Sequence, residues 1–238
     1  MNDFPKTIAI IMDGNRRWAK KNKLPMLAGH TKGSKTIKNI ISNCAELNIR
    51  ELTIFAFSTE NWKREITEVN SLLKLIEYYL KSEIAEMNLN NIKFKSVGDT
   101  SIFNQTIQNL IKSAENITYN NTGLQLNVCL NYGGIADLIH ATKLISEKIV
   151  SKEISIDQID YNCIKENLLS SQISDVDLLI RTSGENRISN FLPIQLSYTE
   201  MYFTETLWPD FTKDDLLVAF DYFSKRERRF GSSLSVSK

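Results

Sequence analysis

Short apolar runs alternate along this chain with segments in which apolar residues have helical spacing. The run at 51–57, ELTIFAF, is almost entirely apolar, which is typical of a strand covered on both faces. Runs of this kind predict six strands, at 7–12, 51–57, 91–98, 124–130, 176–180 and 200–205. Helical spacing predicts helices at 34–45 with Ser34 as N-cap, and at 72–87, 102–115 and 136–150. The order predicts an α/β fold, a mostly parallel six-stranded sheet flanked by helices on both faces.

Length, charge and cysteine content exclude several classes of protein. The 238 residues contain no repeat and no linker rich in glycine or proline, so we expect a single domain over 1–238. The formal net charge of +1 gives no reason to expect nucleic acid as a partner. Three scattered cysteines without metal-ligand spacing indicate reduced thiols. Since no apolar run suits a membrane span or a signal peptide, we expect a cytoplasmic protein.

Polar side chains gather after four of the predicted strands. Ligands of open α/β sheets bind outside the carboxyl ends of the strands, so these clusters should share one edge. The clusters are residues 13–18, 58–64, 131–134 and 181–189. We therefore expect the ligand site at this edge of the sheet.

The side chains in these clusters favour an anionic ligand. Five arginines supply the forked donors that suit phosphate oxygens, namely Arg16, Arg17, Arg64, Arg181 and Arg187. Gly14 and Asn15 lead into a helix whose first amide groups attract anions. Asp13 and Glu200 are candidate ligands of a Mg²⁺ ion that bridges phosphates. The combination predicts a diphosphate ligand.

Simpler interpretations exist for each residue taken singly. Asp13 is as well explained as a helix cap, paired arginines commonly form a solvated face, and His30 suits a structural role. Trp18 and Trp62 are by default packing residues. The convergence of several arginine-bearing loops with Asp13 favours the functional interpretation.

Other enzyme classes fit less well. The chain has no Walker-type phosphate loop and no G-x-G-x-x-G after the first strand. A phosphohydrolase with an aspartyl nucleophile ranks second, because Asn15 stands where such enzymes carry a second acid. The absence of a D-D-x-x-D box argues against the all-helical prenyl synthases.

Several blocks in this order resemble the cis-prenyltransferase family over nearly the whole chain. They are Asp13–Trp18, Gly29-His30-x-x-Gly33, Phe57–Trp62 with Arg64, Gly98-Asp99, Asn131–Gly134, Arg181–Glu185, Arg187–Phe191, Glu200–Phe203, Leu207–Pro209 and Arg226–Gly231. The resemblance implies a Mg²⁺-dependent transferase that condenses isopentenyl diphosphate onto farnesyl diphosphate. Its implied product is a long-chain Z-polyprenyl diphosphate, undecaprenyl diphosphate, the lipid carrier of cell-wall synthesis. It also implies a homodimer, with transient membrane contact for product release.

The resemblance also implies roles for individual residues. The implied substrate-binding set is Gly14, Asn15, Arg16, Arg17, Trp18, His30, Ser58, Thr59, Glu60, Trp62, Arg64, Arg181, Arg187 and Ser189. Asp13 and Glu200 would hold Mg²⁺, with Glu200 donated either within the chain or across a dimer. Either Asn61 or the departing diphosphate would accept the proton lost from isopentenyl diphosphate.

The hydrocarbon product requires an apolar tunnel. The helix at 72–87 and the inner face of LTIFAF are the expected walls, and the small Ala56 would leave room for a long tail. The chain departs from common family residues at Met26, Ile135, Asn186 and Ile194, so Asn186 is not assigned to metal. A non-catalytic regulatory relative is the alternative from another class. The joint presence of Asp13, Arg17, Asn61 and Arg181 argues against it.

Overall fold

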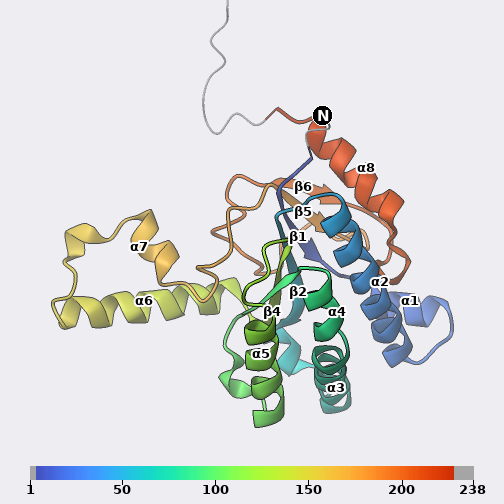
Figure 1. Cartoon of the computed structure of the whole chain (residues 1–238), viewed down its shortest axis with the longest axis horizontal. Helices are drawn as coiled ribbons and strands as arrows, with labels where there is room; N and C mark the ends of the chain where they lie inside the picture. Colours follow the sequence, from blue (N-terminus) through green and yellow to red (C-terminus); the bar gives the residue numbers. More distant parts are fainter. Residues whose placement is uncertain (1–3, 228–238) are drawn as a thin grey trace, which may run out of the picture.

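Six parallel strands form the centre of the molecule, in the spatial order β3-β4-β2-β1-β5-β6 (Figure 1). The computed structural model describes residues 4–227. The strands are β1 Thr7–Ile11, β2 Glu51–Ser58, β3 Lys93–Val97, β4 Gln125–Tyr132, β5 Leu178–Arg181 and β6 Glu200–Phe203. All six predicted strands are confirmed, and every neighbouring pair is parallel.

The helices confirm the predicted alternation and differ from it at several boundaries. They are α1 Asn15–Lys21, α2 Met26–Glu46, α3 Ile66–Ser82, α4 Ile84–Leu89, α5 Gln105–Ile117, α6 Gly134–Val150, α7 Tyr161–Glu166 and α8 Lys213–Ser224. Short 3-10 turns are η1 Thr59–Lys63, η2 Thr100–Ile102, η3 Ile156–Gln158 and η4 Trp208–Asp210.

Two helical predictions need correction, and two helices were not predicted. Helix α2 begins at Met26 after Pro25, so Ser34 lies inside it and its Oγ donates to the His30 carbonyl instead of capping. The segment at 72–87 is two helices, α3 and α4, which meet at Glu83. Helices α7 and α8 had no counterpart in the predicted set.

Both faces of the sheet are buried, but different structures cover them. Side chains alternate along β1, so Ile8 and Ile10 join one apolar cluster while Ala9 and Ile11 join the other. Helices α2, α3, α4, α5 and α8 contribute to the first cluster. The second cluster is covered by residues of the irregular segments 167–177 and 182–197 on either side of β5, such as Phe191 and Leu192. The prediction of helices over both faces is therefore wrong for the second face.

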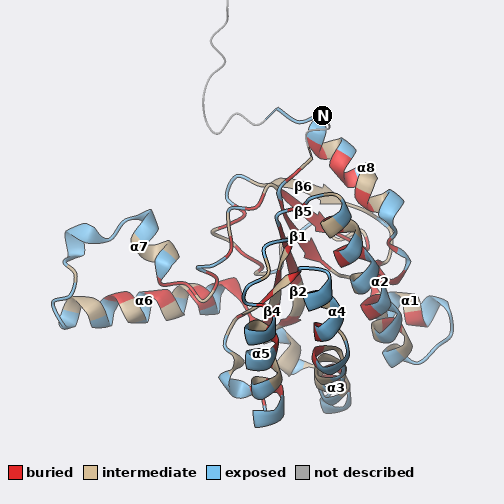
Figure 2. Cartoon of the chain, viewed as in Figure 1, coloured by how far each residue is buried: buried red, intermediate tan, exposed pale blue. Residues whose placement is uncertain are grey.

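Helix α6 explains this difference, because it projects from the body of the molecule together with α7 (Figure 1). Its buried stripe includes Asp137, Ala141 and Ile145, and Figure 2 shows this stripe running between exposed flanks. Asp137 accepts hydrogen bonds from the Leu169 amide at 2.6 Å and from the Ser170 hydroxyl. Helix α6 thus packs on α7 and the following loop. The second face of the sheet is therefore covered by the irregular segments instead of by this helix.

The parallel sheet places the ends of β1, β2, β4 and β5 at one edge. Asp13 lies two residues after β1, Ser58 ends β2 and Arg181 ends β5. The shared edge predicted for the polar clusters is therefore present. Within residues 4–227, the structure contains no helix with the length and apolar character needed to cross a membrane.

Candidate active site

Asp13 and Arg181 meet at the carboxyl edge of the sheet. Ile11 and Arg181 are register partners in β1 and β5, so the two side chains start from neighbouring rigid strands. Arg181 Nη2 donates to Asp13 Oδ2 at 3.0 Å, and its Nη1 donates to Ser189 Oγ at 2.7 Å and to the Arg187 carbonyl. Only 5% of the Arg181 side chain is exposed. A buried guanidinium needs such partners, so its position is fixed.

Asp13 is oriented by the turn that follows it. Its Oδ1 accepts the Gly14 amide at 2.7 Å, and Gly14 has φ 110°, a left-handed conformation that favours glycine. Arg17 Nη2 lies 3.5 Å from Asp13 Oδ2, while Arg17 also donates to the Ser183 carbonyl at 2.7 Å. One third of the Asp13 side chain is exposed. The carboxylate is therefore held in place and still open to a ligand.

A second charged group, the Glu68 cluster, consists of Glu68 with Arg16, His30 and Arg64. Arg64 Nη1 lies 2.8 Å from Glu68 Oε1, and Arg16 Nη1 lies 3.8 Å from Glu68 Oε2. His30 Nε2 is 3.9 Å from Glu68 Oε1 and, though buried, has no hydrogen-bond partner. The cluster brings together α1, α2 and α3 with Arg64, which directly follows η1, at this edge.

The environment keeps His30 neutral. Burial lowers its pKa from 6.5, and the neighbouring Arg64 and Arg16 lower it further, while Glu68 opposes them. A neutral imidazole can donate or accept a hydrogen bond, and it adds no charge to the arginines beside it. His30 is therefore suited to contact a ligand next to the cationic side chains.

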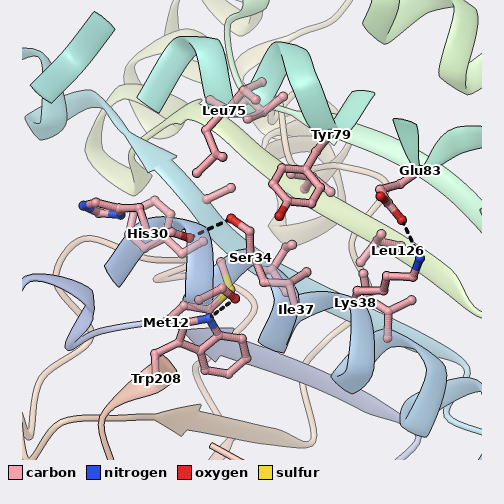
Figure 3. A pocket seen from close by; sticks show the side chains of 18 of the residues that line it. Met12, His30, Ser34, Ile37, Lys38, Leu75, Tyr79, Glu83, Leu126 and Trp208 are labelled. Atoms are coloured by element: carbon pink, nitrogen blue, oxygen red, sulfur yellow. Dashed lines mark hydrogen bonds and ion pairs between the residues drawn. The ribbon is translucent and has the colours of Figure 1, made fainter. Parts of the chain in front are cut away.

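A cavity of about 1170 Å³ begins at these polar groups and continues between α2, α3 and the sheet (Figure 3). The polar lining at this end is Asp13, Asn15, His30, Ser58, Glu60, Asn61, Arg64, Arg181 and Ser189, together with Asn190, and further polar residues such as Lys38, Glu83 and Glu86 line its other end. Its apolar walls include Ile37, Ile41, Ile54, Ala56, Leu72, Leu75, Ile76, Leu80, Ile84, Leu126 and Val128. The predicted tunnel walls, Ala56 included, are confirmed as cavity walls. A charged entrance at the strand ends thus joins a mainly apolar stretch between α2, α3 and the sheet.

Nine of the predicted site residues line this cavity directly. Four others contact residues of the lining. Gly14 and Arg17 contact Asp13, and the Arg187 carbonyl accepts from Arg181. Arg16 is one step further away, because it pairs with Glu68, which binds the lining residue Arg64. The Arg187 side chain itself pairs with Glu185 and is 61% exposed. The structure therefore brings Asp13, Arg64 and Arg187 to one edge, with Arg187 at its rim.

Three predicted substrate contacts bind other parts of the protein. Trp62 Nε1 donates to Asn131 Oδ1 at 2.8 Å, and its ring packs edge-on against Phe57. Trp18 Nε1 donates to Asp210 Oδ1 at 2.7 Å. Thr59 lies against Gly133, where an added Cβ would meet its Oγ1 at 2.5 Å. These positions fit packing roles, and the three side chains are absent from the cavity lining.

Glu200 lies at the amino ends of the strands, whereas Asp13 lies at their carboxyl ends. It begins β6 and pairs with Leu178, whereas Arg181 pairs with Phe203 three residues later. Three residues of strand correspond to about 10 Å. Glu200 Oε2 instead pairs with Arg226 Nε at 3.0 Å. The prediction that Glu200 joins Asp13 at a metal is thus wrong within one chain, and its donation by a second subunit stays a prediction.

The predicted basic segment 226–231 lies mostly outside the described residues. Only Arg226 of its arginines is described, and it binds Glu200 and packs over the Tyr222 ring.

The sequence analysis missed Glu68 and Asn190. Glu68 lies four residues after Arg64, a spacing that brings side chains together on a helix, and this could have marked it. Asn190 donates to Glu60 Oε1 at 2.8 Å and accepts the Ile135 amide at 2.8 Å. Its φ of 64° is set by a loop, and no sequence signal identified that contact.

The described residues hold no group of three or more His, Cys, Asp or Glu side chains able to bind a metal. Asp13 is a partly exposed carboxylate beside Arg181 and Arg17, and Glu185 lies 3.2 Å from Arg17 on the other side. One carboxylate does not make a site on its own. A single carboxylate can nevertheless contribute to a Mg²⁺ site, because proteins commonly hold Mg²⁺ by one or two carboxylates, with phosphate and water completing the ligands.

Comparisons with known proteins agree on one family. Residues 11–231 match the prenyltransferase family model described as "Putative undecaprenyl diphosphate synthase". A ditrans,polycis-undecaprenyl-diphosphate synthase ((2E,6E)-farnesyl-diphosphate specific) of Vibrio parahaemolyticus is 45% identical over 97% of this chain and 92% of its own. The enzyme of the same name from Buchnera aphidicola is 48% identical, with the same coverage.

Two solved structures share the fold. Lavandulyl diphosphate synthase from Lavandula x intermedia, in complex with dimethylallyl diphosphate, has a TM-score of 0.93 and 36% identity, covering 96% of this chain and 99% of that one. A probable undecaprenyl diphosphate synthase from Campylobacter jejuni has a TM-score of 0.80 and 33% identity, covering 98% and 100%.

Proposed function

The chain belongs to the undecaprenyl diphosphate synthase family of cis-prenyltransferases, and from that premise we propose that it condenses isopentenyl diphosphate units onto farnesyl diphosphate. The product is a long-chain Z-polyprenyl diphosphate, undecaprenyl diphosphate, which serves as lipid carrier in cell-wall (peptidoglycan) synthesis.

One observation carries the proposal, namely that a single cavity joins a cationic edge to an apolar interior. Asp13, Arg64 and Arg181 line one part of it, and aliphatic side chains of α2, α3 and the sheet line the rest. An isoprenoid diphosphate has the same division, with a charged head and a hydrocarbon tail. A ligand of that form is matched at both ends.

The two diphosphates are assigned to two parts of the edge. The allylic diphosphate lies on Gly14, Asn15, Arg16 and Arg17, at the start of α1. Isopentenyl diphosphate lies on Arg181, Arg187 and Ser189. The hydrogen bond of 2.7 Å between Arg181 and Ser189 supports the second assignment, because it places two donors side by side. Arg64 and His30 stand between the diphosphates and the tunnel.

Mg²⁺ fits the first diphosphate beside Asp13, because this carboxylate is partly exposed and phosphate oxygens complete the ligand set. When bound, the ion supplies positive charge that offsets the charge of the departing diphosphate. Arg17 and Arg181 hold Asp13 from the protein side and add to the same electrostatic stabilisation.

The proton is taken by the departing diphosphate. Asn61 Oδ1 accepts the Ser58 amide at 3.1 Å, so the oxygen of Asn61 is engaged in capping the η1 turn. Its Nδ2 group remains as a donor in the cavity wall. Asn61 thus orients a phosphate oxygen, whereas the second interpretation makes it the proton acceptor. Asn61→Asp, which supplies a basic carboxylate, raises turnover only under that second interpretation.

The assembly and location of the protein follow the same proposal. A homodimer would cover the isoleucines of the projecting α6, since Ile135 and Ile139 are 64% and 51% exposed on one helical face. The protein is cytoplasmic and contacts the membrane transiently when it releases its product. Light scattering on the purified chain tests the dimer.

Radiolabelled isopentenyl diphosphate tests the activity directly. The purified chain is mixed with farnesyl diphosphate, labelled isopentenyl diphosphate and Mg²⁺, and the butanol-extractable label is counted. Extraction of labelled polyprenyl product supports the proposal. The absence of product under these conditions contradicts it and favours the non-catalytic alternative.

A further inference from the structure

The segment 189–192 contains residues in a backbone conformation that side-chain-bearing residues rarely adopt. Ser189, Asn190 and Leu192 have φ values of 50°, 64° and 46°. Each such residue costs conformational energy, which the contacts around it must offset. Ser189 and Asn190 line the cavity, at the part of the edge assigned to isopentenyl diphosphate. The unusual backbone therefore falls at the proposed site, and the contacts of Asn190 show what holds it.

Two hydrogen bonds fix Asn190 to the start of helix α6. Its carbonyl accepts the Gly134 amide at 2.7 Å, and its Oδ1 accepts the Ile135 amide at 2.8 Å. Both amides lie in the first turn of α6, where a helix has no partners of its own to offer them. Asn190 thus caps α6 from a different segment of the chain.

The same side chain binds the η1 turn. Asn190 Nδ2 donates to Glu60 Oε1 at 2.8 Å. Partial burial raises the pKa of the Glu60 carboxyl, but hydrogen bonds from Asn190, from its own amide and from the hydroxyls of Ser58 and Thr59 lower it further than burial raises it. Glu60 is therefore ionised, and a hydrogen bond to an ionised group is stronger than one between neutral groups. Asn190 thus joins its own loop to both α6 and η1.

Two glycines leave space for this junction. An added Cβ at Gly133 would lie 2.5 Å from Thr59 Oγ1 and 2.9 Å from Asn190 Nδ2. An added Cβ at Gly134 would lie 3.2 Å from the Asn190 carbonyl oxygen. A larger residue at Gly133 would therefore push η1 and the Asn190 loop apart. The block Asn131–Gly134 is absent from the cavity lining, and its glycines act by letting these two segments approach each other.

The η1 turn depends on polar contacts, because none of its residues is buried. Glu60 and Asn61 of this turn nevertheless line the cavity. Its far end is held by Trp62, whose Nε1 donates to Asn131 Oδ1. The bond between Glu60 and Asn190 ties the cavity-lining part of the turn to the loop that carries Ser189.

We propose that Asn190 is a positioning residue for isopentenyl diphosphate, which sets the place of η1 relative to Arg181 and Ser189. This inference rests on the proposed function, which assigns isopentenyl diphosphate to that loop. Because the Asn190 amide already binds Glu60 and α6, it acts on the substrate through its neighbours. The allylic diphosphate is assigned to the start of α1, so its binding should depend much less on Asn190.

Reversal of the Glu60–Asn190 hydrogen bond tests the proposal. Asn190→Asp keeps the acceptor for the α6 amide, but it removes the donor and brings a second carboxylate against Glu60. Glu60→Gln keeps an acceptor for Asn190. In the double variant N190D/E60Q, the glutamine amide can donate to the aspartate, so the bond is restored with donor and acceptor exchanged. The matched control is Asn121→Asp, which removes a 2.7 Å bond to the Ile92 carbonyl and adds the same charge away from the cavity lining.

The readout is the Kd of each diphosphate by isothermal titration calorimetry, which needs no turnover, beside KM and urea unfolding. Hydrogen bonds to charged groups contribute strongly, and because Glu60 is exposed we expect the lower end of their range, an increase of about 10-fold in the Kd of isopentenyl diphosphate for N190D. In the E60Q background the same substitution should raise this Kd by less than about threefold, since the pair is restored. The Kd of farnesyl diphosphate should stay unchanged, as should both values for Asn121→Asp. A merely structural role would lower stability in both backgrounds and would not separate the two substrates.

Three results would overturn this proposal alone: no increase in N190D, the same increase in both backgrounds, or an equal increase for both diphosphates. A wild-type chain that binds no isopentenyl diphosphate would overturn the proposed function together with this inference.

Discussion

Replacement of Asp13 by asparagine separates the two tasks of this side chain. Asparagine can still accept the Gly14 amide through Oδ1, so the turn after β1 is preserved. Its amino group then faces the Arg181 and Arg17 donors that now contact Oδ2, at 3.0 and 3.5 Å. The variant therefore loses the negative charge and keeps the shape.

The effect of D13N on the free energy of unfolding follows from the burial of the ion pair. Breaking a buried ion pair costs about 3–5 kcal/mol when the remaining charge has no other partner. Arg181 keeps Ser189 and the Arg187 carbonyl, and one third of Asp13 is already in solvent, so screening reduces the value. We expect D13N to lower the free energy of unfolding by about 1–2 kcal/mol.

The cost to catalysis is larger. Removal of one preorganised charge from a reacting site typically lowers kcat about 10²- to 10³-fold. Because the arginines still bind the diphosphate, KM for farnesyl diphosphate should change much less than kcat.

The assay measures kcat and KM for isopentenyl diphosphate incorporation at saturating Mg²⁺, beside urea unfolding. Asp210→Asn is the control, since Asp210 binds Trp18 outside the cavity lining and should leave kcat unchanged. A D13N enzyme with kcat within threefold of wild type would refute the role assigned to this carboxylate.

Three further perturbations test other parts of the site. Gly29→Ala places a Cβ 2.1 Å from the Asn15 carbonyl oxygen, and we expect it to destabilise the fold by about 1–3 kcal/mol in urea unfolding, unlike the exposed Lys35→Ala. His30 has a folded pKa below 6.5, so the unfolded chain binds more protons and stability should fall as pH drops below 6.5. NMR titration should place the His30 pKa below that value, and a His30 signal that titrates at or above 6.5 contradicts the burial argument. Chelation by EDTA should abolish incorporation and leave the melting temperature unchanged, because the described residues contain no cluster of ligands for a structural metal; restored activity on adding Mg²⁺ completes the test.

The strand ends explain what could be predicted from the sequence. Asp13 and Arg181 could be predicted as site residues because both follow apolar runs. Parallel strands bring such residues to one edge of the sheet, independently of how the helices pack. The same rule explains why the prediction for Glu200 was wrong within one chain, since Glu200 begins its strand and so lies at the amino ends of the strands. The position of a residue before or after its apolar run thus carries more information than its membership of a block that resembles the family.

Contacts made through helix packing could not be predicted in this way. Glu68 belongs to α3 only because that helix begins at Ile66, six residues before the predicted start. Its partners Arg16 and His30 come from two other helices. Helical spacing predicts which side of a helix is buried, but it does not predict the neighbour. The same limit explains α6, whose apolar stripe packs on α7 and not on the sheet.

The two glycines at the start of α2 connect packing to charge. A Cβ at Gly29 would meet the Asn15 carbonyl, and a Cβ at Gly33 would meet Asn15 Oδ1, each at 2.1 Å. Larger residues would therefore push α1 away from α2. Because α1 carries Arg16 while α2 carries His30, such a shift would separate the Glu68 cluster that stands at the entrance of the cavity. The spacing Gly29-His30-x-x-Gly33 is thus a packing requirement, and its effect on ligand binding is exerted through the position of the arginines.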